Sequence, residues 1–249
     1  MLQARSIHLV VDNRDGVALG MQPTSLSDLF VRQPVEQLSA GQALFFEGDA
    51  AKHLFRVISG TIRIFKIISD GRRVITRFLH AGDIIGVSLK DVYLNSADAI
   101  GDACVQRVSR KTLEQELVRT PELGPDMFAR MCDELAAQQD QMVLLSRKNA
   151  EERLCTFLRA EMRRAAANGA IGAMLELPMT RLDVADYLGL TIETVSRTLT
   201  KLANKGILSI SGRHVVRIIR QAALAQLCGD DDEYAGERNM VACWARQHH

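Results

Sequence analysis

The stretch from Arg181 to Lys205 reads RLDVADYLGLTIETVSRTLTKLANK and carries the clearest structural pattern in the chain. Its two apolar-periodic segments meet at Gly189, and glycine adopts without strain the left-handed backbone that a tight turn between helices requires. Ala185 stands where the two helices would approach each other, so that only a small side chain fits. The apolar residues that would form a shared core are Val184, Leu188, Leu190 and Val195. The stretch therefore predicts a helix-turn-helix that begins at Arg181.

The second helix of this motif has a recognisable start. Thr191 stands at the N-cap position, Thr194 follows at the spacing of a capping pair, and Glu193 lies in the first turn, where an acid is favourable. These residues predict a helix that begins at Thr191.

The outward face of the second helix follows by subtraction of the core positions. Its residues are Glu193, Ser196, Arg197 and Thr200. In the major groove of DNA, Arg197 can donate two hydrogen bonds to a guanine, Glu193 can accept one from a cytosine, and a serine can approach thymine or adenine. The alternative is that Glu193 and Arg197 form a surface ion pair one helical turn apart, and both interpretations can hold together.

A hairpin is predicted after this helix. Ile207 to Ile210 and His214 to Ile219 have the composition of two strands around Ser211-Gly212. Such a hairpin is the wing of a winged helix-turn-helix. Candidate contacts to DNA phosphates are Lys201, Lys205 and Arg213, although ordinary solvent-facing cations remain the alternative for each.

The N-terminal half has a different pattern. From Val35 to about Ser109, short β-branched and aromatic runs alternate with turns that contain Asp-Gly or Gly-Asp. This spacing is typical of an antiparallel roll or barrel. The predicted strands are Leu44 to Phe46, Leu54 to Ser59, Thr61 to Ile68 and Val74 to Leu79. Residues 1–34 show little periodicity and are expected to be a loosely ordered lead-in.

A long helix is predicted from about Pro125 to Asn149. Its seam residues recur at the spacing of a heptad pattern: Phe128, Met131, Leu135, Gln138, Met142 and Leu145. The seam either packs on its own roll or pairs with a second copy in a homodimer, in which Gln138 would fix the register or face an effector. A second helix is expected from Ala150 to about Ala166, followed by a loop from Ala167 to Pro178.

Composition places further limits on the chain. Apolar and charged residues make up 47% and 24% of the 249 residues, as in an ordinary globular protein. Residues 150–221 hold 11 Lys and Arg against 7 Asp and Glu, whereas residues 222–249 hold 2 against 5. The basic excess fits attraction to phosphates, and an ordinary solvated surface is the alternative. The chain has no apolar run long enough for a membrane span, so we expect a cytoplasmic protein. The five cysteines are scattered, and in a reducing compartment we expect them to be free thiols.

Two stretches resemble a known family. DQMVLLSRKNAEERL, from Asp140 to Leu154, and YLGLTIETVSR, from Tyr187 to Arg197, are similar to the cyclic-AMP-receptor/FNR (CRP/FNR) superfamily of bacterial regulators, and to its FNR/FixK branch. The resemblance extends from about Val35 to Gly229. It implies that Glu193, Ser196 and Arg197 read a TTGA-type half-site in an inverted repeat. It also implies a homodimer that contacts RNA polymerase and activates genes of low-oxygen or nitrogen metabolism.

The resemblance and the patterns together predict an α+β chain. Its parts are a lead-in (1–34), a cyclic-nucleotide-binding-like antiparallel β-roll (35–120), a dimerisation helix (121–149), a winged helix-turn-helix (150–221) and an acidic flexible tail (222–249). The alternative function is an effector-binding module whose C-terminal domain docks a protein. No nucleophile–base set or phosphate loop indicates an enzyme, and no residue spacing indicates a metal site.

Two departures from the family limit the cofactors. No cysteine precedes Cys104, and one thiolate cannot hold an iron–sulfur cluster that needs four. Gly86-Val87 and Ser96-Ala97 stand where cyclic-AMP receptors carry the acid and the cation that hold the nucleotide. We therefore expect no cofactor, with haem on His53, His80 or Cys104 as a residual alternative.

Overall fold

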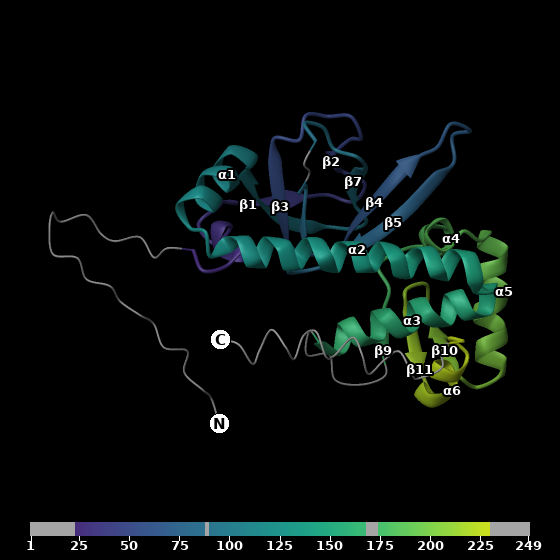
Figure 1. Cartoon of the computed structure of the whole chain (residues 1–249). Helices are drawn as coiled ribbons and strands as arrows, with labels where there is room; N and C mark the ends of the chain where they lie inside the picture. The colour runs from purple at the N-terminus through teal and green to yellow at the C-terminus, as the bar shows by residue number, and fades with distance from the viewer. Residues whose placement is uncertain (1–22, 88–89, 168–173, 230–249) are drawn as a thin grey trace, which may run out of the picture.

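The computed structural model describes residues 23–87, 90–167 and 174–229. A β-roll packs beside one long helix, α2, and a smaller domain lies at the C-terminal end of that helix (Figure 1). The strands of the roll are β1 (Val35–Leu38), β2 (Ala43–Phe45), β3 (His53–Ser59), β4 (Ile62–Ile67), β5 (Arg73–Leu79), β6 (Ile84–Ile85), β7 (Ser96–Ala99) and β8 (Ala103–Ser109).

The other described elements are helices around the roll and a second domain. Around the roll lie the 3-10 helix η1 (Leu26–Leu29) and the helices α1 (Arg110–Arg119) and α2 (Leu123–Arg147). The second domain contains α3 (Ala150–Ala167), β9 (Met174–Glu176), α4 (Arg181–Leu188), α5 (Ile192–Asn204), β10 (Leu208–Ser211), β11 (Val215–Ile218) and α6 (Gln221–Gln226). None of the helices in these described ranges combines the length and hydrophobicity that a membrane crossing needs.

The roll consists of two antiparallel sheets with the orders β1-β8-β3-β6 and β2-β7-β4-β5. Ile62 and Ile64 point into the apolar interior, while Arg63 between them stays half-buried on the other face, as alternation along a strand requires. Gly60 makes the turn from β3 to β4 with φ 81°. A Cβ atom there would lie 2.5 Å from the carbonyl oxygen of Asp102, so the turn needs glycine.

The long helix starts at Leu123 and ends at Arg147, two residues earlier at each end than the pattern predicts. Its start can precede Pro125 because proline is tolerated in the first turn of a helix. The helical conformation then stops at Lys148 and Asn149, which separate α2 from α3. The Asn149 side chain accepts hydrogen bonds from the backbone N–H groups of Glu151 at 3.0 Å and Glu152 at 3.1 Å, and so starts α3.

The predicted flexible tail is wrong for its first residues. Helix α6 packs against α3, and both Leu224 and Cys228 are fully buried in the core of the second domain. The rest of the predicted tail, residues 230–249, lies outside the described residues, as do residues 1–22 of the predicted lead-in.

Two other segments also contain more structure than predicted. The predicted loop from Ala167 to Pro178 contains β9, which pairs with β11 and makes the wing sheet three-stranded. The end of the predicted lead-in contains η1, and Leu26 and Phe30 are buried against the roll. Both segments are too short for periodicity to reveal them.

Truncation of Leu224 tests the reassignment of α6. We expect Leu224→Ala to lower the free energy of unfolding by about 2–5 kcal/mol, because it leaves a cavity in the core. Urea denaturation measures the effect. Gln226→Ala, at an exposed position of the same helix, is the control and should change the value by less than about 0.5 kcal/mol. A small effect for both variants would show that α6 is not part of the core.

Candidate nucleic-acid interface

The first helix of the helix-turn-helix, α4, is capped at both ends. The Thr180 hydroxyl accepts a hydrogen bond from the backbone N–H of Asp183 at 3.1 Å, and the Asp183 carboxylate accepts one from the backbone N–H of Thr180 at 2.9 Å. Gly189 ends the helix with φ 62° and ψ 40°, the left-handed conformation that the sequence predicts. The cap at Thr180 was not predicted, although a threonine followed three residues later by an acid is its usual signature.

The two helices of the motif share the predicted core. Val184, Ala185, Leu188 and Val195 are at most 5% exposed, and Leu190 packs beside them half-buried. Because α4 and α5 are packed on one core, any contact that orients α4 also orients α5.

The start of α5 is polar and exposed. Thr191 is its N-cap residue and accepts a hydrogen bond from the backbone N–H of Thr194 at 3.2 Å. The pKa of Glu193 is lowered, first by a hydrogen bond from its own backbone N–H, then by one from Thr191, and also by the charge of Arg197. The Glu193 carboxylate is therefore an ionised acceptor at neutral pH.

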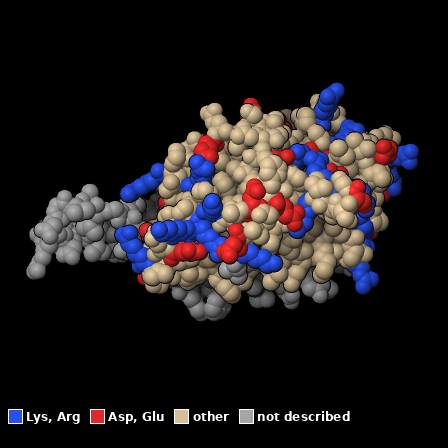
Figure 2. All heavy atoms as spheres, turned by 90° about the horizontal axis from the view of Figure 1, so that it is seen from above, with Lys and Arg blue, Asp and Glu red and all other residues tan. Residues whose placement is uncertain are grey.

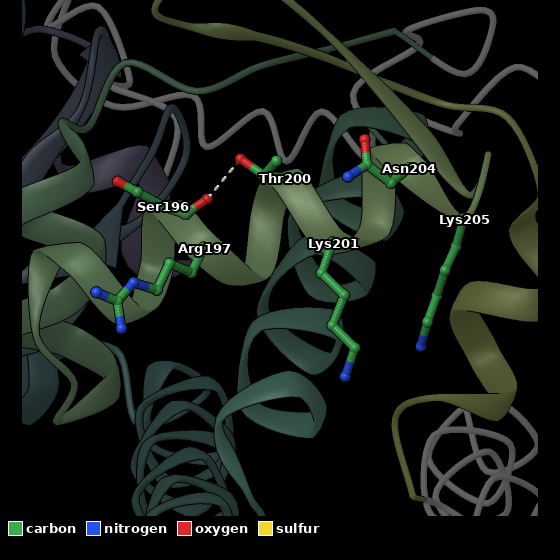
Figure 3. A pocket seen from close by; sticks show the side chains of 6 residues that line it. All are labelled: Ser196, Arg197, Thr200, Lys201, Asn204 and Lys205. Atoms are coloured by element: carbon green, nitrogen blue, oxygen red, sulfur yellow. Dashed lines mark hydrogen bonds between the residues drawn. The ribbon is translucent and has the colours of Figure 1, made fainter.

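The outward face of α5 is formed by Glu193, Arg197 and Thr200, which are exposed, and Ser196, which is half-buried. Thr200 donates a hydrogen bond to the backbone oxygen of Ser196 at 3.0 Å (Figure 3). Within the described ranges no ion pair joins Glu193 to Arg197, so the surface-pair alternative is not realised in this conformation. Arg181 of α4 approaches this face, with its guanidinium 3.4 Å from the Ser196 hydroxyl.

The second half of α5 lines a shallow hollow together with Ser196, Arg197 and Thr200. Lys201, Asn204 and Lys205 complete its lining (Figure 3). Both lysines bind the carboxylate of Glu151 on α3; the distance from Lys205 Nζ to Glu151 Oε1 is 2.7 Å. Sequence reasoning missed Glu151, because it lies 50 positions from Lys201 in the chain, and it also missed Asn204.

The wing lies next to this helix in the same domain. Arg213 is exposed in the turn between β10 and β11. His214 follows it, and its ring Nδ1 lies 2.9 Å from the backbone oxygen of Leu177. The structure thus presents Arg213 at the tip of the hairpin, as predicted from the sequence.

A cluster of charged residues fastens α4 to the roll. Asp183 Oδ1 accepts hydrogen bonds at 2.7 Å from Arg63 of β4 and from Arg73 of β5. Arg63 also binds both carboxylate oxygens of Asp98, at 2.7 and 2.8 Å, and Arg73 binds Asp186 of α4 at 2.9 Å. We call these five residues the Asp183 cluster. It joins residues about 110 positions apart, so no sequence pattern could have predicted it.

The surroundings of Asp183 favour the ionised form of its carboxylate. Burial alone would raise the pKa of Asp183, but hydrogen bonds from Thr180 and the charges of Arg63 and Arg73 outweigh burial, and the pKa is lowered. The Asp183 carboxylate is 2% exposed, and therefore its loss would leave the two guanidinium groups without their shared partner.

An aromatic contact lies beside the Asp183 cluster. Phe78 of β5 packs against Tyr187 of α4 with ring centroids 5.2 Å apart, and Phe157 of α3 lies 5.7 Å from Tyr187. The side-chain amide of Gln141 on α2 donates to the backbone oxygen of Tyr187 at 2.9 Å. The roll, α2 and the helix-turn-helix therefore meet around one turn of α4.

The seam of α2 does not pack on the roll. All six seam residues are exposed, including Phe128 at 69%, Leu135 at 61% and Met142 at 65%. The side of the helix that does pack carries Leu123 and Leu144. An apolar strip of this kind on the surface of one chain marks a site of association.

On the roll face seen in Figure 2, acidic side chains are interspersed among basic ones. This agrees with the balanced charge of residues 1–149, which hold 18 Lys and Arg and 18 Asp and Glu. The electrostatic argument for nucleic acid therefore rests on the second domain.

Comparison with known proteins gives two family matches. Residues 152–227 match the Crp-like helix-turn-helix domain, and residues 35–120 match the cyclic nucleotide-binding domain. The fumarate and nitrate reduction regulatory protein of Escherichia coli (strain K12) is 37% identical over 200 residues, which cover 80% of this chain and 78% of that protein. This chain belongs to the Crp/FNR family of transcription regulators.

Two further relatives support a place near FixK within the Crp/FNR family. The nitrogen fixation regulation protein FixK of Bradyrhizobium diazoefficiens is 38% identical over 172 residues, or 69% of this chain and 73% of that protein. The structure of FixK2 from Bradyrhizobium japonicum matches with a TM-score of 0.76 and 35% identity, covering 80% of this chain and 98% of that one. The predicted family and fold class are confirmed, and the relatives are regulators rather than enzymes.

Two ligands associated with the Crp/FNR family do not fit the residues present. Cys104 lies in β8 and supplies one thiolate, whereas an iron–sulfur cluster is held by four cysteine thiolates. Within the described residues no group of three or more His, Cys, Asp and Glu side chains is arranged to hold a metal ion. At the expected nucleotide position, the Ser96 hydroxyl accepts from the backbone N–H of Glu47 at 3.0 Å and Ala97 is buried, so neither offers a charge to a cyclic phosphate.

The three candidate haem ligands lie in different parts of the roll. His53 is in β3, with its ring centroid 6.2 Å from that of Phe55, and Cys104 is in β8. The His80 ring lies 3.4 Å from the Thr61 hydroxyl and 3.5 Å from the Glu161 carboxylate.

Loss of the Asp183 carboxylate tests the connection between the roll and α4. The folded-state pKa of Asp183 is lowered, so its stabilisation is complete above the unfolded value of about 3.9 and is lost as pH falls through the folded value. We expect Asp183→Asn to lower the free energy of unfolding at pH 7 by about 3 kcal/mol and to reduce its fall between pH 5 and pH 2.

Urea denaturation across this pH range measures both effects. Arg73→Gln is the milder variant, because Arg63 remains with Asp183, and it should fold with a smaller loss. If Asp183→Asn keeps the stability and acid sensitivity of the natural protein, the proposed connection is wrong.

Proposed function

We propose that this protein is a homodimeric transcription activator that binds an inverted repeat of TTGA-type half-sites and recruits RNA polymerase. The proposed targets are genes of low-oxygen or nitrogen metabolism, as the names of the FNR and FixK relatives suggest. A regulator of this kind acts on DNA in the cytoplasm. The observation that carries the proposal is the exposed polar face at the capped start of α5.

The side chains of this face match base edges in the major groove. The Arg197 guanidinium is exposed and can donate two parallel hydrogen bonds to the O6 and N7 atoms of a guanine. Glu193 stands one turn earlier and, because it is ionised, can accept from the N4 amino group of a cytosine. Ser196, which Arg181 approaches, can contact thymine or adenine.

Contacts to the DNA backbone position this face without reading sequence. The residues proposed for them lie on α5, the proposed reading helix, and at its two caps, with one more at the tip of the wing: Thr191, Thr194, Thr200, Lys201, Lys205 and Arg213. Hydroxyl groups and cations bind phosphates in this way and determine the register of a protein on the duplex.

The seam of α2 supports the homodimer. Two parallel helices that bury Phe128, Leu135 and Met142 against their partners would satisfy the exposed apolar strip, and a polar residue such as Gln138 restricts register. A two-fold axis along this seam would present two copies of α5 in opposite orientation. An inverted repeat with half-sites about one or more helical turns apart is the matching DNA.

The alternative of a C-terminal domain that docks a protein lacks support at this surface. Protein-binding hot spots favour tryptophan, tyrosine and arginine. Of positions 193, 196 and 197 of α5, only the last carries such a side chain, since Glu193 is an acid and Ser196 a small hydroxyl residue.

Alanine at Arg197 tests the base contact. We expect Arg197→Ala to weaken binding to a TTGA inverted repeat by about 1–3 kcal/mol while random duplex DNA is bound nearly as before. Fluorescence anisotropy with both duplexes at fixed salt measures the difference. Arg213→Ala is the matched control and should weaken both DNAs alike. Equal losses for Arg197→Ala on the two DNAs would show that Arg197 does not read a base.

A charge in the seam tests the homodimer. We expect Leu135→Glu to shift the protein from dimer to monomer, because two like charges would face each other across the interface. Light scattering coupled to size-exclusion chromatography measures the mass. Ala129→Glu, exposed on α2 away from the seam, is the control and should stay dimeric. A dimer that survives Leu135→Glu would place the interface elsewhere.

A further inference from the structure

The carboxylate of Glu151 occupies both lysines at the end of the reading helix. Glu151 lies in the first turn of α3, and its two oxygens accept hydrogen bonds from Lys201 and Lys205. Lys201 lies in the last turn of α5 and Lys205, four positions later, is its C-cap residue, so both stand on one side of the helix, as Figure 3 shows. Both line the same hollow as Ser196 and Arg197.

This arrangement divides α5 into two parts. The N-terminal part, with Glu193 and Arg197, has no ion pair between these residues and offers its polar groups to solvent. The C-terminal part carries two positive charges of which one is neutralised inside the protein. Hydrogen bonds from Lys201 and from Lys205, in that order, lower the pKa of Glu151, so the carboxylate stays ionised around neutral pH.

The contact contributes little to the stability of the fold. The side chains of Lys201 and Lys205 are 56% and 43% exposed, and exposed ion pairs contribute little to stability. The contact instead affects how strongly a negatively charged partner binds to the two lysines. A phosphate that approaches Lys201 or Lys205 must displace the Glu151 carboxylate or bind beside it, and either event weakens the attraction.

We propose that Glu151 withholds Lys201 and Lys205 from DNA phosphates and thereby lowers the sequence-independent affinity of the protein. The proposal rests on the DNA-binding function proposed above. Contacts to phosphates supply nearly all of the free energy of non-specific binding. A protein whose lysines are held back therefore depends more on the base contacts of Glu193 and Arg197.

Replacement of Glu151 by glutamine is the test. We expect Glu151→Gln to bind a random-sequence duplex about three- to tenfold more tightly at about 0.1 M salt. We also expect a steeper fall of log K with log salt concentration, by about 0.9 for each additional phosphate that a released lysine neutralises. Fluorescence anisotropy over a series of salt concentrations gives both values, and a purely structural role of Glu151 would not steepen the slope.

Glu152→Gln is the matched control. It makes the same change of charge on the next residue, but the Glu152 carboxylate accepts from the backbone N–H of Asn149 at 2.8 Å rather than from the lysines. We expect it to leave the salt dependence near that of the natural protein. Equal slopes for the two variants, or weaker binding by Glu151→Gln, would overturn the proposal.

A triple variant completes the design. Adding Lys201→Gln and Lys205→Gln to Glu151→Gln should remove the increase in affinity, since no released ammonium group remains. An increase that persists would also overturn the proposal. A different result would contradict the proposed function, namely that the natural protein binds the TTGA repeat and random DNA equally.

Discussion

The carboxylate of Asp183 is the point on which the arrangement of the two domains depends. One oxygen completes the cap of α4, and the other binds Arg63 and Arg73 of the roll. A nearly buried acid in contact with two guanidinium groups is favourable only while all partners stay in place. Because α4 and α5 share one apolar core, this carboxylate also influences how the roll orients α5.

The orientation of α5 leaves its polar face open while its other side is buried. Val195, Leu199 and Leu202 pack into the core of the second domain, whereas Glu193 and Arg197 lie at the surface. The α2 helix runs from the roll to this domain and carries an apolar strip that the described residues of this chain leave exposed. This exposed strip supports the proposed homodimer, in which each copy of α5 would be attached to its roll through the Asp183 cluster.

Sequence alone predicted much of the fold and of the site, and the reason is locality. The helix-turn-helix follows from requirements within about 15 residues, such as the small Ala185, the turn at Gly189 and the cap at Thr191. The Asp183 cluster and the pairing of Glu151 with two lysines were missed because their partners lie far apart in the chain. Strand β9 and helix α6 were missed because their few residues are stabilised by tertiary contacts with β11 and α3 rather than by their own periodicity.

Methylation interference on a DNA fragment that carries the inverted repeat tests most directly whether α5 lies in the major groove. Dimethyl sulfate methylates guanine at N7 in the major groove and adenine at N3 in the minor groove. The account predicts that methylation of the guanine in each TTGA half-site blocks binding symmetrically, because Arg197 needs the N7 atom. Interference confined to minor-groove adenines, or none at the half-site guanines, would contradict it.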